Sequence, residues 1–430
     1  MKFISIAEAM KKGSGKIAVR GWIYRERGSN EFKFIILRDS SNIIQCVFKK
    51  EKFPQQWNDI DKLQIESSLE IEGILKKDKR APTGYEIEAE KINIVGISKD
   101  FPINKSLNEE LLGDRRHLWL RSQKMTAIMK IRSRYVQARE QFFREQGFYR
   151  FDTPVLQPTQ SEGGSTVFEV KYYDSKAYLA QTWQLYGEAA IFALEKVYNM
   201  GPTFRAEKSK TSRHLSEFWM AETEVAWWKL DEITEFAKKE IKYCLEKVGE
   251  DCAEEFKILG QDAKNILKIA KKKWPTIKYR DALKILKEKD GIKISFGKDL
   301  RTIEEQKLMQ HFDTPVIVTH YPKEVMAFYK PQDPKNSDEA LCFDMLAPRC
   351  GLEIVGGSER SLDIKNMSEN LKKDGENPED YSFYFDLRKY GSVPHSGYGV
   401  GIERVLQWIC GLETIKDAIA FPRTMTRYKP

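Results

Sequence analysis

Residues 201–224 constrain the fold most, because two strand-like segments there flank a short, polar and basic loop. In an antiparallel pair alternate side chains face the same way, so we expect Glu222 and Glu224 to share a face. The loop carries the cations Lys208, Lys210, Arg213 and His214. Arginine forks and lysine charges suit a polyphosphate ligand. The alternative is an exposed hairpin with a solvated charged tip, and composition alone favours that alternative.

The size and composition of the chain indicate a globular protein of two or three domains. It has 430 residues, of which 41% are hydrophobic and 12% aromatic, enough for substantial cores. An excess of 72 Lys and Arg over 64 Asp and Glu gives a net charge of +8. This charge is compatible with an RNA partner but does not establish one.

The cysteines and the apolar segments predict a cytoplasmic protein. The six cysteines form no CxxC pair, so they read as scattered thiols and not as a disulfide framework or a zinc site. No apolar run reaches transmembrane length, and the amino terminus lacks a signal-peptide pattern. We expect no membrane partner.

Residues 1–100 are expected to form a small β-barrel. Five short segments are rich in β-branched and aromatic residues and are separated by turn residues: 17–24, 32–37, 43–48, 68–75 and 85–95. One helical interruption, near residues 54–63, suits a Greek-key barrel of the oligonucleotide-binding (OB) type. Arg25, Phe34 and Gln45 would offer a phosphate contact, a stacking face and a base-edge hydrogen bond. Spacing leaves open whether Phe34 belongs instead to the core.

Residues 101–122 read as a connector, and residues 123–430 read as a second domain with mixed helices and strands. A long amphipathic helix is predicted over 125–145, followed by a strand over 148–156. Pro154 confines that strand to an edge or an interface. Paired glycines then predict a mobile loop over 161–166, before another helix.

The remainder of the chain divides into a charged insertion and a set of strands. Residues 231–310 are helix-rich and patterned with Lys and Glu, which predicts a peripheral insertion with solvated faces and no chemistry. Strands at 342–346 and 351–360 carry Asp344 and Glu353, which are plausible magnesium ligands. A pair of surface acids is the equal alternative.

A Gly-rich turn opens a final helix near residue 402. Gly397, Gly399 and Gly401 would let backbone approach a ligand, and Arg404 lies in the first turn of the helix. A lone GxGxG is weak evidence, because it does not follow the dinucleotide-binding pattern.

Together these stretches resemble the three motifs of class II aminoacyl-tRNA synthetases. The helix and strand with Pro154 resemble motif 1, and Phe204-Arg-x-Glu with Arg213-His-Leu-x-Glu-Phe218 resembles motif 2. Gly399-x-Gly-x-Glu-Arg404 resembles motif 3. With a barrel in front, the pattern is that of the aspartyl/asparaginyl/lysyl subgroup, and it is most similar to the asparagine-specific members. The occurrence of the three motifs in this order along the chain overturns the interpretation of residues 201–224 as an exposed hairpin.

The resemblance implies an α+β fold, an OB-type barrel followed by a catalytic domain on an antiparallel sheet flanked by helices. It also implies an ATP site in which Arg205 grips the α-phosphate and Phe218 stacks on adenine. Arg404 would cover the other adenine face and reach the γ-phosphate. Glu207, Arg213 and His214 would complete the ATP site. Glu353, with Asp344, would hold Mg²⁺.

For the amino acid, the resemblance implies a pocket for L-asparagine. Glu162 and Gln184 would seat the amino acid, Glu222 would accept from the side-chain amide, and Arg360 would donate to its oxygen. Aspartate-specific relatives place lysine at the position of Gly187 and aspartate at that of Glu222. Two departures from the family, Thr182-Trp183 and Glu359, leave the fine geometry of the pocket open.

The partners implied are tRNA(Asn), ATP and a second copy of the chain, with the strand of Pro154 at the dimer interface. Phe34 and Gln45 would read the middle anticodon base, and Arg27 can replace Arg25 in this role. Three alternatives remain: an aspartyl-tRNA synthetase, an asparagine-synthesising relative that lacks the barrel, and a non-catalytic RNA-binding paralogue. Gly187 and Glu222 argue against the first of them.

Overall fold

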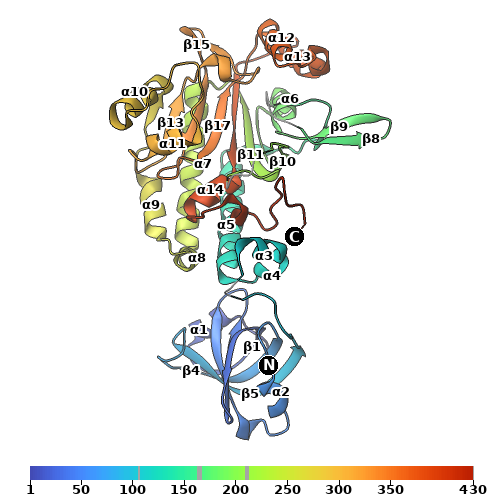
Figure 1. The fold of residues 1–430 in the computed structure, drawn as a ribbon, viewed down its shortest axis with the longest axis vertical. Helices are drawn as coiled ribbons and strands as arrows, with labels where there is room; N and C mark the ends of the chain where they lie inside the picture. The colour runs from blue at the N-terminus through green and yellow to red at the C-terminus, as the bar shows by residue number, and fades with distance from the viewer. Residues whose placement is uncertain (105–106, 162–166, 209–212, 430) are drawn as a thin grey trace. The chain divides into compact units, whose positions relative to one another are not determined.

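A computed structural model describes residues 1–104, 107–161, 167–208 and 213–429 (Figure 1). The chain forms two compact units, Met1–Leu107 and Asn108–Pro430. Each has a hydrophobic core of its own. No helix in the described part of the chain is long and apolar enough to cross a membrane.

The first unit is a closed five-stranded barrel, as the sequence predicted, and its strand order is β1-β2-β3-β5-β4. Its elements are α1 (Ile6–Lys12), β1 (Gly15–Gly28), β2 (Phe32–Arg38), β3 (Ile43–Lys49), α2 (Trp57–Asp61), β4 (Ser68–Lys77) and β5 (Tyr85–Gly96). Side chains in β2 alternate between buried and half-buried, which is the period-two pattern of a barrel strand. The unpredicted helix α1 begins at a capping box, in which Ser5 and Glu8 each accept from the other's backbone N–H.

The second unit is built on an eight-stranded sheet with the order β12-β13-β16-β17-β18-β11-β10-β6. The bounds are β6 (Tyr149–Arg150), β10 (Lys196–Phe204), β11 (Glu217–Ala226), β12 (Thr276–Lys278), β13 (Val316–Thr319), β16 (Cys342–Leu346), β17 (Glu353–Glu359) and β18 (His395–Gly401). The predicted antiparallel arrangement holds for the central strands. The edge pairs β12–β13 and β6–β10 are parallel, and each pair is joined by a connection that contains a helix.

The unit also contains helices, several of which contribute buried side chains to the main core. They are α3 (Glu109–Asp114), α4 (Arg116–Trp119), α5 (Gln123–Glu145), α6 (Gln184–Leu194), α7 (Leu230–Asp251), α8 (Ala253–Ile258), α9 (Ala263–Lys271), α10 (Tyr279–Asp290), α11 (Thr302–Met309), α12 (Ile364–Lys373), α13 (Ser382–Lys389) and α14 (Ile402–Ile409). The expectation that the insertion is peripheral is wrong for α7. Its side chains Ile233, Ile241 and Val248 join the core beneath the sheet beside α5, because they recur at helical spacing within the Lys/Glu pattern.

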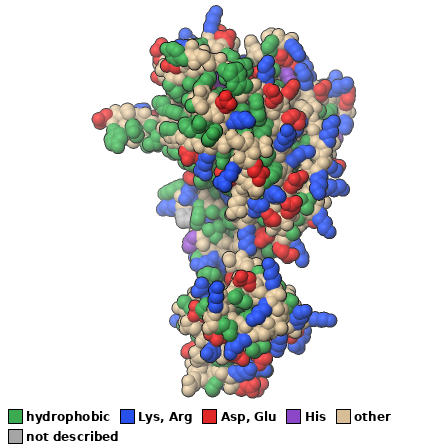
Figure 2. Space-filling view, turned by 180° about the vertical axis from the view of Figure 1, so that it is seen from behind, with side chains coloured by type: hydrophobic (Ala, Val, Ile, Leu, Met, Phe, Trp, Pro, Cys, Tyr) green, Lys and Arg blue, Asp and Glu red, His purple; other side chains and the backbone are tan. Residues whose placement is uncertain are grey.

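The predicted strand around Pro154 is interrupted. Only Tyr149–Arg150 joins the large sheet, and Leu156–Gln157 forms β7 of a separate sheet with β9 (Ser175–Leu179) and β8 (Glu169–Tyr172). Pro154 lies between them, where its missing N–H breaks no ladder. The β8–β9 hairpin projects from the unit, and the face of it seen in Figure 2 carries hydrophobic side chains (Figures 1 and 2). Tyr173 is 81% exposed at its tip.

Candidate active site

The predicted motif residues converge on one pocket between β11, β17, β18 and α14. Residues far apart in sequence line it: Arg205, Glu207, Arg213, His214, Phe218, Glu353, Gly399, Gly401, Arg404, Thr424 and Met425. The pocket therefore brings motif 2 and motif 3 together with Glu353, as the sequence predicted.

Arg205 and Phe218 form one wall of this pocket. Arg205 follows the end of β10, and its backbone N–H donates to the oxygen of Ser216 at 3.0 Å. Its guanidinium carbon lies 5.4 Å from the centre of the Phe218 ring. The Arg205 Nε is buried and has no hydrogen-bond acceptor among the described residues. This cation is thus held in place against an aromatic face with a donor available for an anion.

Arg404 and Glu353 form an ion pair in the pocket. The Arg404 Nη1 donates to the Glu353 backbone oxygen at 2.9 Å and to its Oε2 at 3.0 Å. Burial opposes ionisation of Glu353, but Arg404 and Arg205 outweigh it and hold the pKa of Glu353 below its usual value. Glu353 is therefore a carboxylate in the resting site.

Asp344 lies beside Glu353 on the neighbouring strand, where Asp344 pairs with Gly356. A Cβ at Gly356 would lie 3.0 Å from the Glu353 Oε1 and 3.5 Å from the Asp344 Oδ1, so both oxygens face the same small space. Burial, with the charge of Glu353, raises the pKa of Asp344 to about 8. A divalent cation would relieve this accumulation of negative charge. The two carboxylates fit Mg²⁺, which commonly takes one or two protein carboxylates plus substrate phosphates.

Two further acids reach this cluster from the predicted insertion, Asp299 and Glu305. Burial raises the pKa of Glu305 to about 8, and Glu353 and Asp344 add to the effect. Burial and the charge of Glu353 likewise raise the pKa of Asp299. The insertion, in which the sequence indicated no chemistry, thus places two acids within electrostatic reach of Glu353 and Asp344. No group of three His, Cys, Asp or Glu ready to hold a metal occurs in the described residues, so any ion here depends on ligand oxygens as well.

The residues that follow the motif 2 loop lie at the mouth of the pocket. The Arg213 Nη2 donates to the Cys350 oxygen at 2.7 Å, and the His214 Nε2 is 3.7 Å from the Glu207 Oε2. Burial lowers the pKa of His214 against the opposing effect of Glu207, so the imidazole is mainly neutral at pH 7.

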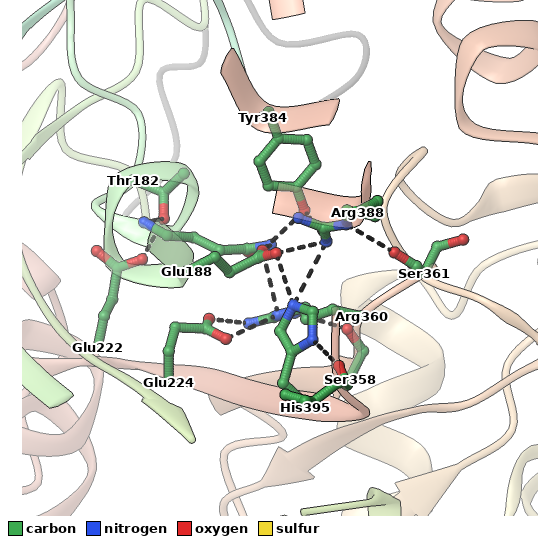
Figure 3. Close-up of polar contacts among 12 residues, drawn as sticks. Thr182, Glu188, Glu222, Glu224, Ser358, Arg360, Ser361, Tyr384, Arg388 and His395 are labelled. Atoms are coloured by element: carbon green, nitrogen blue, oxygen red, sulfur yellow. Dashed lines mark hydrogen bonds and ion pairs between the residues drawn. The ribbon is translucent and has the colours of Figure 1, made fainter. Parts of the chain in front are cut away.

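A second polar cluster adjoins the pocket, and it contains Glu222 and Glu224 on one face of β11, as expected (Figure 3). Arg360 donates to Glu224 through Nε, at 3.2 Å, and through Nη2, and its Nη1 donates to the Ser358 Oγ at 2.7 Å. Burial raises the pKa of Glu224 to about 8 although Arg360 opposes it. Arg360 is thus fixed as a fork with a defined direction.

Glu188, Arg388, His395 and Tyr384 enclose this cluster, and sequence reasoning missed all four (Figure 3). The Glu188 carboxylate accepts from the Arg388 Nη2 at 2.5 Å and from the Tyr384 hydroxyl at 2.8 Å, and it lies 3.0 Å from the His395 Nε2. They come from α6, α13 and β18. No local spacing in the sequence announces such a contact between three elements.

Gln184 begins α6, and its Nε2 donates to the Glu188 Oε1 at 2.9 Å. Trp183 is buried behind the pocket and not in its mouth. Glu359 turns away from Arg360, because its Oε1 accepts from the Leu230 N–H at the start of α7, at 2.9 Å. Glu162 lies outside the described residues.

A groove on the barrel contains Phe34 and Gln45, together with Arg27. The Arg27 guanidinium carbon is 4.9 Å from the centre of the Phe34 ring, and the Gln45 Nε2 donates to the Glu86 Oε2 at 3.0 Å. Phe34 is half-buried at this surface and lies outside the core cluster. Arg25 is not among the groove residues and lies over Tyr24, so Arg27 suits the predicted role better.

Comparison with known protein families decides the assignment of the larger unit. Residues 108–425 match the family described as tRNA synthetases class II (D, K and N), and residues 17–95 match the OB-fold nucleic acid binding domain. The chain belongs to the class II tRNA synthetases of the D, K and N type.

Relatives of this class II synthetase are similar over nearly their full length. An asparagine–tRNA ligase of Thermoplasma acidophilum is 43% identical over 99% of this chain and 100% of its own, and one of Thermococcus kodakarensis is 44% identical over 96% of each. The crystal structure of asparaginyl-tRNA synthetase from Pyrococcus horikoshii with asparaginyl-adenylate has a TM-score of 0.95 and 38% identity, with 100% of both chains covered.

Proposed function

We propose that this class II synthetase ligates L-asparagine to tRNA(Asn) in an ATP-dependent reaction that passes through asparaginyl-adenylate. The observation that carries the proposal is the juxtaposition of two sites. A pocket with the cations Arg205 and Arg404 lies beside a cluster that presents Glu222 and Arg360. The named relatives, which are similar over nearly their whole length, support the same activity.

Activation of the amino acid follows from the charges of the pocket. The asparagine α-carboxylate attacks the α-phosphorus of ATP, a new O–P bond forms, and the bond to pyrophosphate breaks, with the electron pair leaving on pyrophosphate. Arg205 binds the α-phosphate, and Phe218 and Arg404 enclose the adenine. Arg213 and His214 orient the outer phosphates, and Glu207 lines the same pocket beside His214. Positioning and charge neutralisation carry this step, and no nucleophilic side chain is required.

Magnesium is the metal that suits Glu353 and Asp344. Both carboxylates face the space over Gly356, and Asp344 binds a proton more tightly than usual until a cation replaces that proton. When bound, Mg²⁺ neutralises phosphate charge during the transfer. Glu305 and Asp299 add to the negative potential around these ligands.

Selection of asparagine over aspartate rests on Glu222 and Arg360. Glu222 accepts a hydrogen bond from the side-chain NH₂, and Arg360 donates to the side-chain oxygen. Aspartate would place a carboxylate against Glu222, and an uncompensated like-charge contact in a closed pocket costs on the order of several kcal/mol. Gln184 seats the amino acid, and we assign the α-ammonium to Glu162.

Transfer to tRNA completes the reaction. The 3′ hydroxyl of the terminal adenosine attacks the adenylate carbonyl carbon, and AMP leaves. The barrel binds the anticodon, with Phe34 stacking on a base, Gln45 reading a base edge and Arg27 holding phosphate.

We also propose a homodimer. The segment around Pro154 exposes apolar side chains: Val155 is 38% exposed and Leu156 is 40% exposed. A second copy that covers them would remove this surface from water. Light scattering should give a mass of two chains, and a single-chain mass would contradict the dimer.

All six thiols are free, which fits the reducing cytoplasm.

Amino-acid-dependent ATP–pyrophosphate exchange tests the reaction directly. Asparagine should support exchange and aspartate should not, with or without tRNA. Arg205→Ala should abolish exchange, because the α-phosphate loses its cation, whereas Lys257→Ala, an exposed cation remote from the pocket, should not. Exchange that follows aspartate would refute the assigned specificity, and full activity in the Arg205 variant would refute its role.

The barrel assignment has a separate test. Gln45→Ala should raise the KM for tRNA in aminoacylation by about fivefold or more, since a buried base-edge hydrogen bond contributes roughly 1–3 kcal/mol. It should leave asparagine-dependent exchange unchanged. Aminoacylation that is insensitive to this substitution would remove Gln45 from the anticodon site.

A further inference from the structure

We propose that Trp183 is a positioning residue that sets the selectivity for asparagine by holding the carboxylate of Glu222 in place. The inference rests on the proposed function and extends it to a side chain that does not itself touch the substrate. Trp183 is one of the departures from the family pattern, and its role follows from three contacts.

The backbone corner at Thr182 and Trp183 binds both oxygens of Glu222. The Trp183 backbone N–H donates to the Glu222 Oε2 at 2.8 Å, and the Thr182 hydroxyl donates to the Oε1 (Figure 3). The same hydroxyl accepts from the Gln184 N–H at 3.0 Å. Glu222 is buried, so these charge-assisted hydrogen bonds are strong and decide the direction of its carboxylate.

The indole of Trp183 anchors this corner to the fold. It is 6% exposed and packs with Ile191 and Val197, which belong to α6 and β10. Its Nε1–H donates to the Phe151 backbone oxygen at 2.7 Å. Packing on one side and a hydrogen bond at the far end leave the ring no alternative rotamer without a buried, unpaired N–H.

Gly187 locks the ring from below. A Cβ at this position would lie 2.2 Å from the Trp183 Cζ3 and 2.4 Å from its Cη2. The ring fits closely against Gly187 while its Nε1–H is bonded to Phe151, so a methyl group at position 187 would force the ring out of this place. Trp183 and Gly187 therefore pack against each other, and the Trp183 ring leaves no space for a side chain, charged or neutral, at position 187.

Beyond the corner lies a cavity that Pro154, Trp183 and Glu222 all line. Removing the indole would join the space it fills to this cavity and let water compete for the Glu222 carboxylate. Glu222 would then bind the amide NH₂ less well and would be better hydrated against an aspartate. Trp183 thus affects the selectivity for asparagine over aspartate. It does not line the proposed ATP pocket and should leave ATP binding unchanged.

The test is ATP–pyrophosphate exchange with asparagine and aspartate, on the full chain. Trp183→Ala should raise the KM for asparagine by about tenfold or more, the loss expected when a hydrogen bond to a charged group is weakened. The asparagine-to-aspartate ratio of kcat/KM should fall, and the KM for ATP should not change. Gly187→Ala should have the same effect by displacing the ring. Trp228→Phe, at a half-buried tryptophan elsewhere, is the matched control and should change neither ratio nor KM.

A double-mutant comparison of Trp183 and Gly187 distinguishes this positioning role from a general effect on packing. In a Trp183→Ala background, adding Gly187→Ala should cause no further loss, because the clash is gone. Should Trp183→Ala not fold, Trp183→Phe carries the same test with a smaller effect, since it keeps a ring but lacks the N–H to Phe151. Unchanged asparagine selectivity in these variants, or equal losses for asparagine and ATP, would overturn the inference. Aspartate-dependent wild-type exchange would instead overturn the proposed function.

Discussion

Glycines in this site leave room for side chains of the neighbouring strand. Gly397 was predicted to let backbone approach a ligand, yet it lies opposite Glu224 in the β11–β18 pair. A Cβ at Gly397 would lie 2.2 Å from the Glu224 Oε1, whereas one at Gly399 would come closest to the Met220 Sδ, at 3.1 Å, and would reach the Glu222 Cγ only at 3.5 Å, an ordinary van der Waals contact. The sequence revealed the glycines but not which partner each of them accommodates, because that partner comes from another strand.

This difference predicts that two glycines only two residues apart serve different substrates. Gly397→Ala should displace Glu224 and so release Arg360, which raises the KM for asparagine with little change for ATP. Gly399→Ala places a methyl group in the wall of the ATP pocket and should raise the KM for ATP instead. Measuring both KM values in exchange tests this split, and parallel changes in both variants would contradict it.

Among the elements, α5 and α7 show where sequence patterns were sufficient and where they were not. The apolar period of α5 correctly predicts an amphipathic helix, whereas the Lys/Glu pattern of α7 predicts a solvated one. Its buried acid Glu240 explains the error, because it pairs with the buried Arg139 of α5 at 2.7 Å. Arg139 also donates to the Asn199 oxygen, at 3.0 Å. A charge pattern cannot distinguish a buried ion pair from a solvated one, because burial is decided by the partner helix.

We predict that the ion pair between Glu240 of α7 and Arg139 of α5 contributes to the stability of the core. Glu240→Ala should lower the free energy of unfolding by about 3–5 kcal/mol, because the guanidinium of Arg139 is left buried without its counter-charge. Glu250, on an exposed turn of the same helix, is the matched control, and its alanine variant should unfold like the wild type. Urea denaturation followed by tryptophan fluorescence provides the comparison. Equal stability of the two variants would exclude a structural role for the pair.

At the scale of the whole molecule, the barrel and the catalytic unit have separate cores, and the sequence predicted both folds from strand spacing and motif order. It could not place Asp299 and Glu305 near Asp344 and Glu353. These acids precede β16 and β17 by about forty residues or more and meet Asp344 and Glu353 only through tertiary packing.

The separate cores predict that the two activities can be divided. A chain of residues 108–430 should catalyse asparagine-dependent ATP–pyrophosphate exchange, because every residue assigned to activation lies within it. It should aminoacylate tRNA(Asn) poorly, since the groove with Phe34 and Gln45 is missing. The full chain with Gln45→Ala is the companion variant and should share the second defect only in part. Loss of exchange in a folded truncated chain would show that activation needs the barrel.

The place of β18 in the large sheet has a consequence for how the protein is made. β18 lies between β11 and β17, yet it leaves the ribosome after both of them. Until it emerges, β11 and β17 lack the strand that pairs with both of them, and unpaired strand edges are prone to wrong pairing. The strand that joins them also carries Gly397 and Gly399, so a nascent chain completes its sheet and its substrate pockets in the same event.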